Sequence, residues 1–100
     1  MSITEFATLR LKPPYTSSSS EVTQFFRRLS DRQSAWSGHP LLFFYNARNP
    51  SEVYLLSGWA DVPAHHAWIG GSENQELLRL AEGILDVVEL VHLGIDFRGF

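Results

Sequence analysis

The sequence YLLSGWADVPAHHAWIGGSENQ, residues 54–75, decides how the rest of the chain is organised. Its first part is apolar and typical of a strand, which ends at Trp59. Asp61 and Pro63 then favour the start of a helix, because an aspartate can cap free N–H groups and a proline costs nothing in the first turn. That helix places two adjacent histidines and a second tryptophan beside the strand end. We therefore expect a functional site at this junction.

The composition is that of one ordinary folded domain, which we expect to span residues 1–100. The chain is 44% hydrophobic and 19% charged, enough apolar material for a single core. Its net charge is −3 and its basic residues are scattered, which argues against nucleic-acid binding. No apolar run approaches the ~20 residues of a membrane helix. The lack of cysteine excludes thiolate sites and fits a soluble cytoplasmic protein.

Hydrophobic periodicity predicts four strands and two helices. The first helix is expected to begin near Ser19 or Ser20, where an S-x-x-E capping box ends at Glu21. The second helix is interrupted at Gly70 and Gly71, after which a second capping box ends at Gln75, so it is either bent or divided in two. The apolar stripe of the first helix contains Val22, Phe25, Phe26, Leu29 and Trp36. The expected strands are residues 4–12, 41–45, 52–59 and 87–97.

This order of elements, βαββαβ, is typical of an α+β ferredoxin-like fold with a four-stranded antiparallel sheet and both helices on one face. The last strand is apolar on both faces. We place Val87, Val91, Leu93, Ile95 and Phe97 on one face and Val88, Leu90, His92 and Asp96 on the other. The second face of the sheet therefore needs a cover, and a second copy of the chain is the commonest one. We predict a homodimer.

The two adjacent histidines are the strongest candidates for chemistry. Consecutive helical residues point about 100 degrees apart, so only one of His65 and His66 faces the sheet. They cannot chelate one metal in the usual i, i+4 manner, and we expect no metal site. We favour His66 as the inward residue, where partial burial against Trp59 would keep it neutral and suited to act as a general base. The alternative is a core histidine that hydrogen bonds to the main chain.

The remaining candidates are aromatic or polar side chains near the same layer. The tryptophans also have a simpler interpretation as part of the core, and His92 as part of a dimer interface. The candidate catalytic residues are His66, His92 and Tyr45. The candidate ligand-binding residues are Trp59, Trp68, Phe26, Asn74 and His65. Neither a phosphate-binding glycine loop nor a G-x-S-x-G elbow occurs.

The pattern L-x-G-W-x-D/S-x-x-x-H, followed by a helix and a strand with an internal histidine, resembles the dimeric α+β barrel superfamily. The chain is most similar to small fungal members of the antibiotic biosynthesis monooxygenase and stress-responsive barrel groups. The resemblance implies a barrel formed across a dimer, with a pocket between the sheet and helices of each subunit. Relatives include cofactor-independent monooxygenases, polyketide cyclases and haem-degrading enzymes. In this resemblance Trp59 matches the strand-end tryptophan and His66 a helix histidine.

Several expected family residues differ here. Cyclase-like relatives use a tyrosine and a histidine where this chain has Trp68 and Asn74. Haem-degrading relatives use an asparagine on the first strand, and none occurs before Asn46. Quinone-forming monooxygenases use an asparagine where Leu55 and Leu56 stand.

The leading hypothesis is a cyclase- or monooxygenase-like enzyme that needs no metal or organic cofactor and acts on an aromatic or polyketide-type ligand. In it His66 moves a proton, Trp59 and Trp68 stack on the ligand, and His92 or Tyr45 orients an oxygen. The alternatives are a non-catalytic dimeric ligand-binding or stress-associated protein of the same fold, and a haem-binding protein.

Overall fold

The computed structural model describes residues 2–99 and confirms the expected order of elements. The divided second helix is two consecutive helices. The elements are β1 (Ile3–Leu11), α1 (Ser20–Ser37), β2 (Leu41–Tyr45), β3 (Glu52–Trp59), α2 (Val62–Ile69), α3 (Ser72–Ala81), β4 (Leu85–Leu93) and the short 3-10 helix η1 (Phe97–Gly99).

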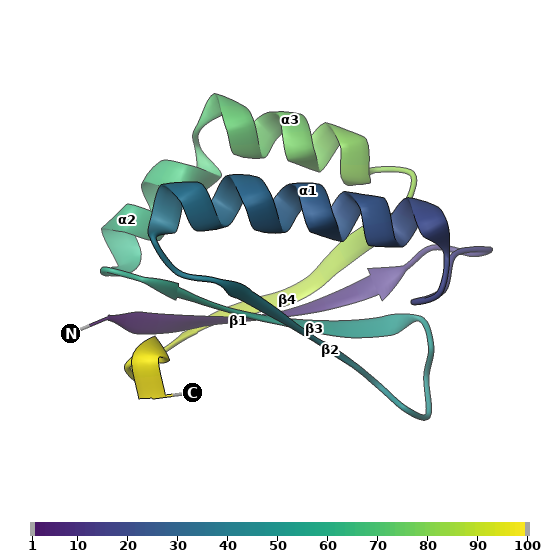
Figure 1. The fold of residues 1–100 in the computed structure, drawn as a ribbon, viewed down its shortest axis with the longest axis horizontal. Helices are drawn as coiled ribbons and strands as arrows, with labels where there is room; N and C mark the ends of the chain where they lie inside the picture. Colours follow the sequence, from purple (N-terminus) through teal and green to yellow (C-terminus); the bar gives the residue numbers. More distant parts are fainter. Residues whose placement is uncertain (1, 100) are drawn as a thin grey trace.

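The four strands form one antiparallel sheet in the order β2-β3-β1-β4. Within the described residues, the three α-helices cover the same face of this sheet, and only η1 lies on the other face (Figure 1). This is the ferredoxin-like arrangement, because the two central strands are the first and third along the chain. The homodimer stays a prediction.

Neither α1 nor α3 begins with the capping-box hydrogen bonds that the sequence predicts. In α1 the residue before the helix is Ser19, and its side chain makes no cap hydrogen bond. In α3 that position belongs to Gly71, and the side chain of Gln75 donates to the carbonyl oxygen of Ile69. Both predicted capping boxes are therefore wrong. The prediction for α2 is confirmed, because Asp61 Oδ1 accepts from the N–H of Ala64 at 2.8 Å.

The core lies between the helices and the inner face of the sheet. Phe26 of α1 stacks on Phe43 of β2, with ring centroids 4.5 Å apart. Trp36 was placed on the apolar stripe, but its side chain is 53% exposed and leans on Trp68. The core residues are Ala7, Leu9, Leu11, Val22, Phe25, Phe26, Leu29, Leu41, Val53, Leu55, Trp59, Trp68, Leu77, Ala81 and Leu85.

A bulge in β4 corrects the predicted faces of that strand. Leu9 pairs with Val87, whereas the preceding Thr8 pairs with Glu89, so one extra residue of β4 is accommodated between them. Because of this extra residue, Val87 and Leu90 lie on the same, helix-covered face. The prediction that placed them on opposite faces is wrong, because a bulge breaks the two-residue alternation.

The last strand also ends earlier than predicted, at Leu93, and Phe97 belongs to η1. The chain turns back so that the buried Phe97 ring meets His39 edge-on, with centroids 5.6 Å apart. A Cβ atom on Gly58 would come within 2.8 Å of both side chains. Gly58 therefore allows the C-terminal segment to pack closely against β3.

Candidate active site

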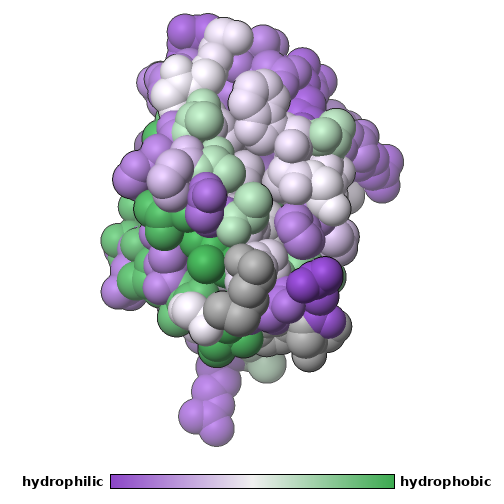
Figure 2. Space-filling model, turned by 90° about the vertical axis from the view of Figure 1, so that its left-hand side faces the viewer, coloured by the Kyte–Doolittle hydropathy of each residue, from purple (hydrophilic) through white to green (hydrophobic). Residues whose placement is uncertain are grey.

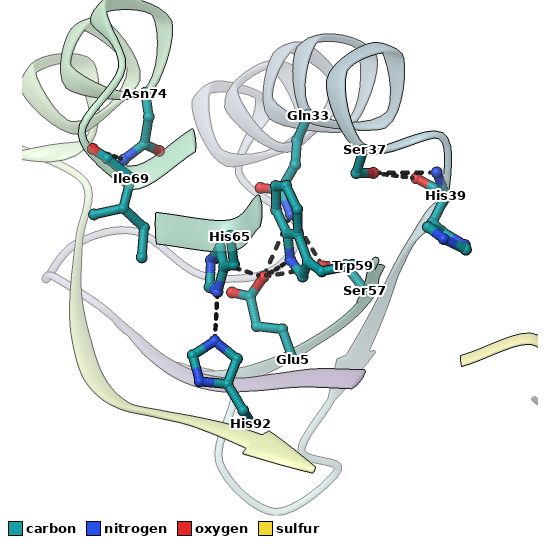
Figure 3. A network of polar contacts seen from close by, with 10 residues as sticks. All are labelled: Glu5, Gln33, Ser37, His39, Ser57, Trp59, His65, Ile69, Asn74 and His92. Carbon is teal, nitrogen blue, oxygen red and sulfur yellow. Dashed lines mark hydrogen bonds and ion pairs between the residues drawn. The ribbon is translucent and has the colours of Figure 1, made fainter. Parts of the chain in front are cut away.

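A buried carboxylate lies at the centre of the candidate site. Glu5 of β1 faces the helices and is only 3% exposed. Its Oε1 atom accepts hydrogen bonds from Trp59 Nε1 at 2.9 Å, Ser57 Oγ at 3.0 Å and Gln33 Nε2 at 3.4 Å (Figure 3). Ser57 is the residue of β3 directly opposite Glu5 in the sheet. Three donors on one oxygen suit an ionised carboxylate, which is costly to bury without partners.

His65 of α2 is the second member of the site. Its side chain is 2% exposed and stacks on the indole of Trp59, with centroids 4.6 Å apart and planes inclined by 21°. Its Nε2 atom lies 3.3 Å from Glu5 Oε1. Burial lowers the pKa of His65, although the negative charge of Glu5 acts in the opposite direction. The imidazole is therefore held in its neutral, basic form, beside a carboxylate that would stabilise its cation.

His92 of β4 extends this arrangement toward the surface. It pairs with Glu5 across the sheet, and its Nε2 atom lies 2.6 Å from Nδ1 of His65 (Figure 3). The two rings meet edge-on with centroids 4.9 Å apart. His66, the exposed neighbour of His65, lies with its ring centroid 6.1 Å from that of His92. Glu5, His65 and His92 thus form one continuous row of titratable groups.

A pocket of about 180 Å³ opens beside Glu5 and His65, between the sheet and the helices. Its polar residues are Glu5, Gln33, His65 and Asn74, and the rest of its wall is mostly apolar. A dry cavity of about 150 Å³ can hold a benzene molecule, so this space suits one substituted aromatic ring. The apolar wall consists of Ala7, Leu9, Phe25, Leu29, Leu55, Trp68, Ile69, Leu77, Leu78, Ala81, Leu85, Val87 and Leu90.

The pocket reaches the surface between α3 and β4. Three of its lining residues, Leu78, Val87 and Leu90, are exposed hydrophobic side chains from these two elements. Hydrophobic residues gather on the side of the molecule where β4 lies (Figure 2). An apolar ligand would therefore contact the apolar side chains at the pocket opening before it reaches the polar end of the pocket at Glu5.

The structure corrects the choice between the two adjacent histidines. His65, not His66, is the inward residue, because the helix that Asp61 caps turns position 65 toward Trp59. His66 is exposed and does not line the pocket. The alternative of a core histidine bound to main chain is also not what is found, since the ring atoms of His65 face Glu5 and His92.

The other candidate residues are divided between pocket, core and surface. Trp68 and Asn74 line the pocket, and Asn74 is held by a hydrogen bond from its Nδ2 to the carbonyl oxygen of Ile69. Trp59 stacks on the ring of His65 and donates a hydrogen bond to Glu5. Phe26 is in the core, whereas its neighbour Phe25 lines the pocket. Tyr45 is half exposed, pairs with Val53 and lies outside the pocket wall.

Three residues of the site were missed by the sequence analysis: Glu5, Gln33 and Ser57. A signal for two of them was present. Glu5 is in phase with Ala7 and the other inward residues of its strand, and Gln33 continues the apolar stripe of α1 four residues after Leu29. A polar residue in the phase of a buried face is a candidate for function, because its burial needs a partner.

The described residues contain no group of three or more histidine, cysteine, aspartate or glutamate side chains placed to hold a metal ion. Within residues 2–99, no helix combines the length and the apolar character needed to cross a membrane.

Solved structures with the same architecture are numerous, although their sequences differ widely from this one. No protein-family model and no curated protein matches the sequence. A proposed antibiotic biosynthesis monooxygenase from Chloroflexus aurantiacus superposes with a TM-score of 0.69 at 11% identity, over 95% of this chain and 94% of that one. This chain has the fold of the antibiotic biosynthesis monooxygenases.

Two further structures support the same assignment of the fold. PA3566 from Pseudomonas aeruginosa gives a TM-score of 0.72 at 18% identity, over 92% of this chain and 91% of its own. SnoaB from Streptomyces nogalater, a cofactor-independent oxygenase, gives 0.67 at 7% identity, over 94% and 92% of the two chains. The predicted resemblance to the α+β barrel proteins is thereby confirmed for the fold.

Proposed function

We propose that this protein is a small-molecule enzyme that removes a proton from a mainly apolar substrate, with His65 as the general base. The observation that carries this proposal is the pair formed by Glu5 and His65 at the polar end of an otherwise apolar pocket. A neutral imidazole can accept a proton through its Nε2 atom. The Glu5 carboxylate, 3.3 Å away, then stabilises the resulting cation without moving.

The surroundings of the pair support the same role. Trp59 stacks on one face of the His65 ring and donates to Glu5, so a single side chain fixes both groups. Ser57 and Gln33 hold the same carboxylate oxygen and are linked by a hydrogen bond of 3.0 Å. Such fixed partners are typical of a preorganised site, because the groups need no reorientation when charge develops.

The pocket indicates the kind of substrate. Its volume suits one substituted aromatic ring, and an apolar wall offers little to a charged or strongly polar compound. Trp68 would pack against the ring, and Asn74 would bind a carbonyl or hydroxyl group. The substrate is accordingly an aromatic or polyketide-type molecule with an acidic C–H beside a carbonyl group.

The carbanion left by proton removal has two possible fates. It reacts with molecular oxygen in an oxygenase, or it attacks a carbonyl carbon of the same molecule in a cyclase. The fold shared with SnoaB, a cofactor-independent oxygenase, supports the first fate. The proposal needs no metal or organic cofactor, because the Glu5–His65 pair supplies the proton acceptor.

The protein is proposed to work as a cytoplasmic homodimer. Phe6, Phe44, Tyr54 and Leu56 form an apolar surface on the uncovered face of the sheet. A second copy would bury this surface and leave the pocket on the helix-covered face untouched. The cytoplasmic location is supported by the lack of cysteine.

The test uses β-tetralone, a two-ring ketone with an acidic C–H next to its aromatic ring. The protein should accelerate the exchange of that hydrogen in heavy water under argon, as followed by proton NMR. His65→Gln and Glu5→Gln should lower this rate by about 10²- to 10⁴-fold, the usual contribution of a positioned base. His66→Gln, a change of the neighbouring exposed histidine, is the matched control and should keep the rate.

Oxygen uptake by the same mixture in air separates the two fates of the carbanion. Exchange with uptake supports an oxygenase, and exchange without uptake supports a cyclase. Binding of the ketone, measured by calorimetry, without faster exchange would instead support the non-catalytic ligand-binding protein. Equal exchange rates for the unaltered protein and His65→Gln would contradict the role of His65.

A further inference from the structure

We infer that His92 selects the tautomer of His65 and thereby decides whether the pocket contains a free base. This inference rests on the proposed function, in which His65 Nε2 accepts the proton of the substrate. His92 touches only the far nitrogen of His65, at 2.6 Å, so it is a positioning residue. The consequence is a site that protonation of His92, a residue outside the pocket wall, switches off.

The short contact between the two histidines permits two arrangements of hydrogens. In the first, Nδ1–H of His65 donates to Nε2 of His92, which leaves Nε2 of His65 bare and able to accept a proton. In the second, Nε2–H of His92 donates to Nδ1 of His65, and Nε2 of His65 carries the hydrogen and faces Glu5. A neutral imidazole has one donor and one acceptor, so these arrangements exclude each other.

The surroundings of Glu5 favour the first arrangement. Its Oε1 atom already accepts hydrogen bonds from Trp59, Ser57 and Gln33, and an oxygen of a carboxylate offers about two lone pairs. The distance of 3.3 Å from His65 Nε2 also exceeds the ~2.7–2.9 Å expected when an N–H donates to a carboxylate. The hydrogen of neutral His65 therefore lies on Nδ1, in the 2.6 Å contact with His92.

Protonation of His92 reverses this arrangement. An imidazolium has no acceptor, so its Nε2–H must donate to His65 Nδ1, and the hydrogen of neutral His65 then moves to Nε2. The charged or titratable groups that face His92 are Glu5 on β1 and the two histidines of α2, His65 and His66. His92 is partly exposed, whereas His65 is buried. Protonation of His92 thus blocks the base without adding a proton to His65.

The experiment measures the tautomer directly, by nitrogen NMR of the isotope-labelled protein, without any substrate. Bare and hydrogen-bearing ring nitrogens have well separated shifts, so the two tautomers of His65 are distinguished in one spectrum. Above the titration of the histidines we expect Nδ1–H for His65. His92→Leu removes the acceptor and should exchange the two shifts, whereas His92→Gln keeps an acceptor oxygen near the same place and should preserve them.

The exposed neighbour again provides the matched control, because His66→Gln should leave the His65 spectrum unchanged. On acidification the unaltered protein should show the two His65 shifts exchange together with the protonation of His92. An Nε2–H tautomer in the unaltered protein at high pH, or a tautomer that ignores His92→Leu, would overturn the inference. If that variant fails to fold, acidification of the unaltered protein still decides, because the two His65 shifts must exchange together with the protonation of His92.

The outcomes separate this inference from the proposed function. If the tautomer is as inferred but His65→Gln leaves the exchange of β-tetralone intact, the assignment of the base fails and the role of His92 in the tautomer stands. If His65→Gln abolishes exchange while the tautomer is Nε2–H, the reaction needs His65, but neither Nε2 as the accepting atom nor the role of His92 stands.

Discussion

The two faces of the sheet depart from the ordinary pattern in opposite ways. The helix-covered face buries a carboxylate and an imidazole, Glu5 and His65, among apolar side chains. The uncovered face exposes aromatic rings, with Phe44 50% accessible and Phe6 stacked on Tyr54. Buried polar groups cost stability unless they are paired, and aromatic groups gathered on an exposed face are typical of an interaction surface. Both departures agree with the proposed partners, a small ligand on the covered face and a second chain on the uncovered face.

The largest expected difference between the faces is in stability. Trp59→Ala on the covered face removes a buried indole, a donor to Glu5 and the ring beneath His65, and should cost about 3–5 kcal/mol of unfolding free energy. Phe44→Ala on the uncovered face should cost under about 0.5 kcal/mol in the isolated chain. Urea unfolding at high dilution, where association does not contribute, measures both. Equal losses of unfolding free energy in the two variants would contradict the proposed difference between the two faces.

A charge on the uncovered face tests its partner. Tyr54→Asp places a carboxylate beside Phe6, in the centre of the predicted dimer interface, and should convert a dimer to monomers. Gln24→Asp adds the same charge to the exposed side of α1 and should keep the dimer. Analytical ultracentrifugation distinguishes these results. An unaltered protein that sediments as a monomer at all concentrations would show that the uncovered face has another use.

The close approach at Gly58 connects the uncovered face to the C-terminal segment. Gly58→Ala puts a methyl group 2.8 Å from His39 and Phe97, and one of these rings must move. Overpacking of this kind typically costs about 1–3 kcal/mol. His39→Ala in the same chain should recover part of the loss, because it removes the ring whose Cγ atom is one of the obstacles, whereas alanine at position 97 would keep the obstructing Cβ. A double-mutant cycle by thermal unfolding checks this coupling, and strictly additive losses would exclude it.

The fold could be predicted because its signals are local. The four strand segments follow from alternation and apolar runs, and Asp61 with Pro63 marks the start of α2. The bulge near Val87 could not be predicted, since pairing with β1 causes it and one strand by itself shows no register. The return of Phe97 to Gly58 is likewise a tertiary contact with no local signal.

The sequence places the candidate site where β3 ends and α2 begins, but it does not give the side chains that meet there. Periodicity leaves the choice between His65 and His66 open, because the two positions lie four and three residues before Ile69 and both spacings are helical. The Asp61 cap settles it, since it fixes where the helix begins. The spacing in L-x-G-W-x-D-x-x-x-H, counted from Trp59, in fact falls on His65. The role of Glu5 was missed because a single carboxylate in a strand reads as an exposed residue unless its phase is compared with Ala7.

The smallest expected effect is the pH dependence of stability that His65, on the covered face, contributes. The pKa of His65 is lowered in the folded protein from its ordinary value of 6.5, mainly by burial. Below pH 6.5, His65 becomes protonated in the unfolded chain but stays neutral in the folded chain until the pH approaches its lowered pKa. The stability due to neutral His65 is therefore complete above 6.5 and falls as the pH drops toward the folded pKa, by at most about 1.4 kcal/mol per pH unit.

Two variants isolate this contribution from the other titrating groups. His65→Gln should flatten the dependence below pH 6.5, whereas His39→Gln, which changes a histidine outside the row of Glu5, His65 and His92, should leave its slope nearly unchanged. Urea unfolding at a series of pH values gives the difference curves. A slope of the opposite sign for His65 would mean that attraction by Glu5 outweighs burial, and the imidazole would then rest as a cation, unable to accept a proton. The stability curve of one buried histidine thus tests the electrostatic basis of the proposed base directly.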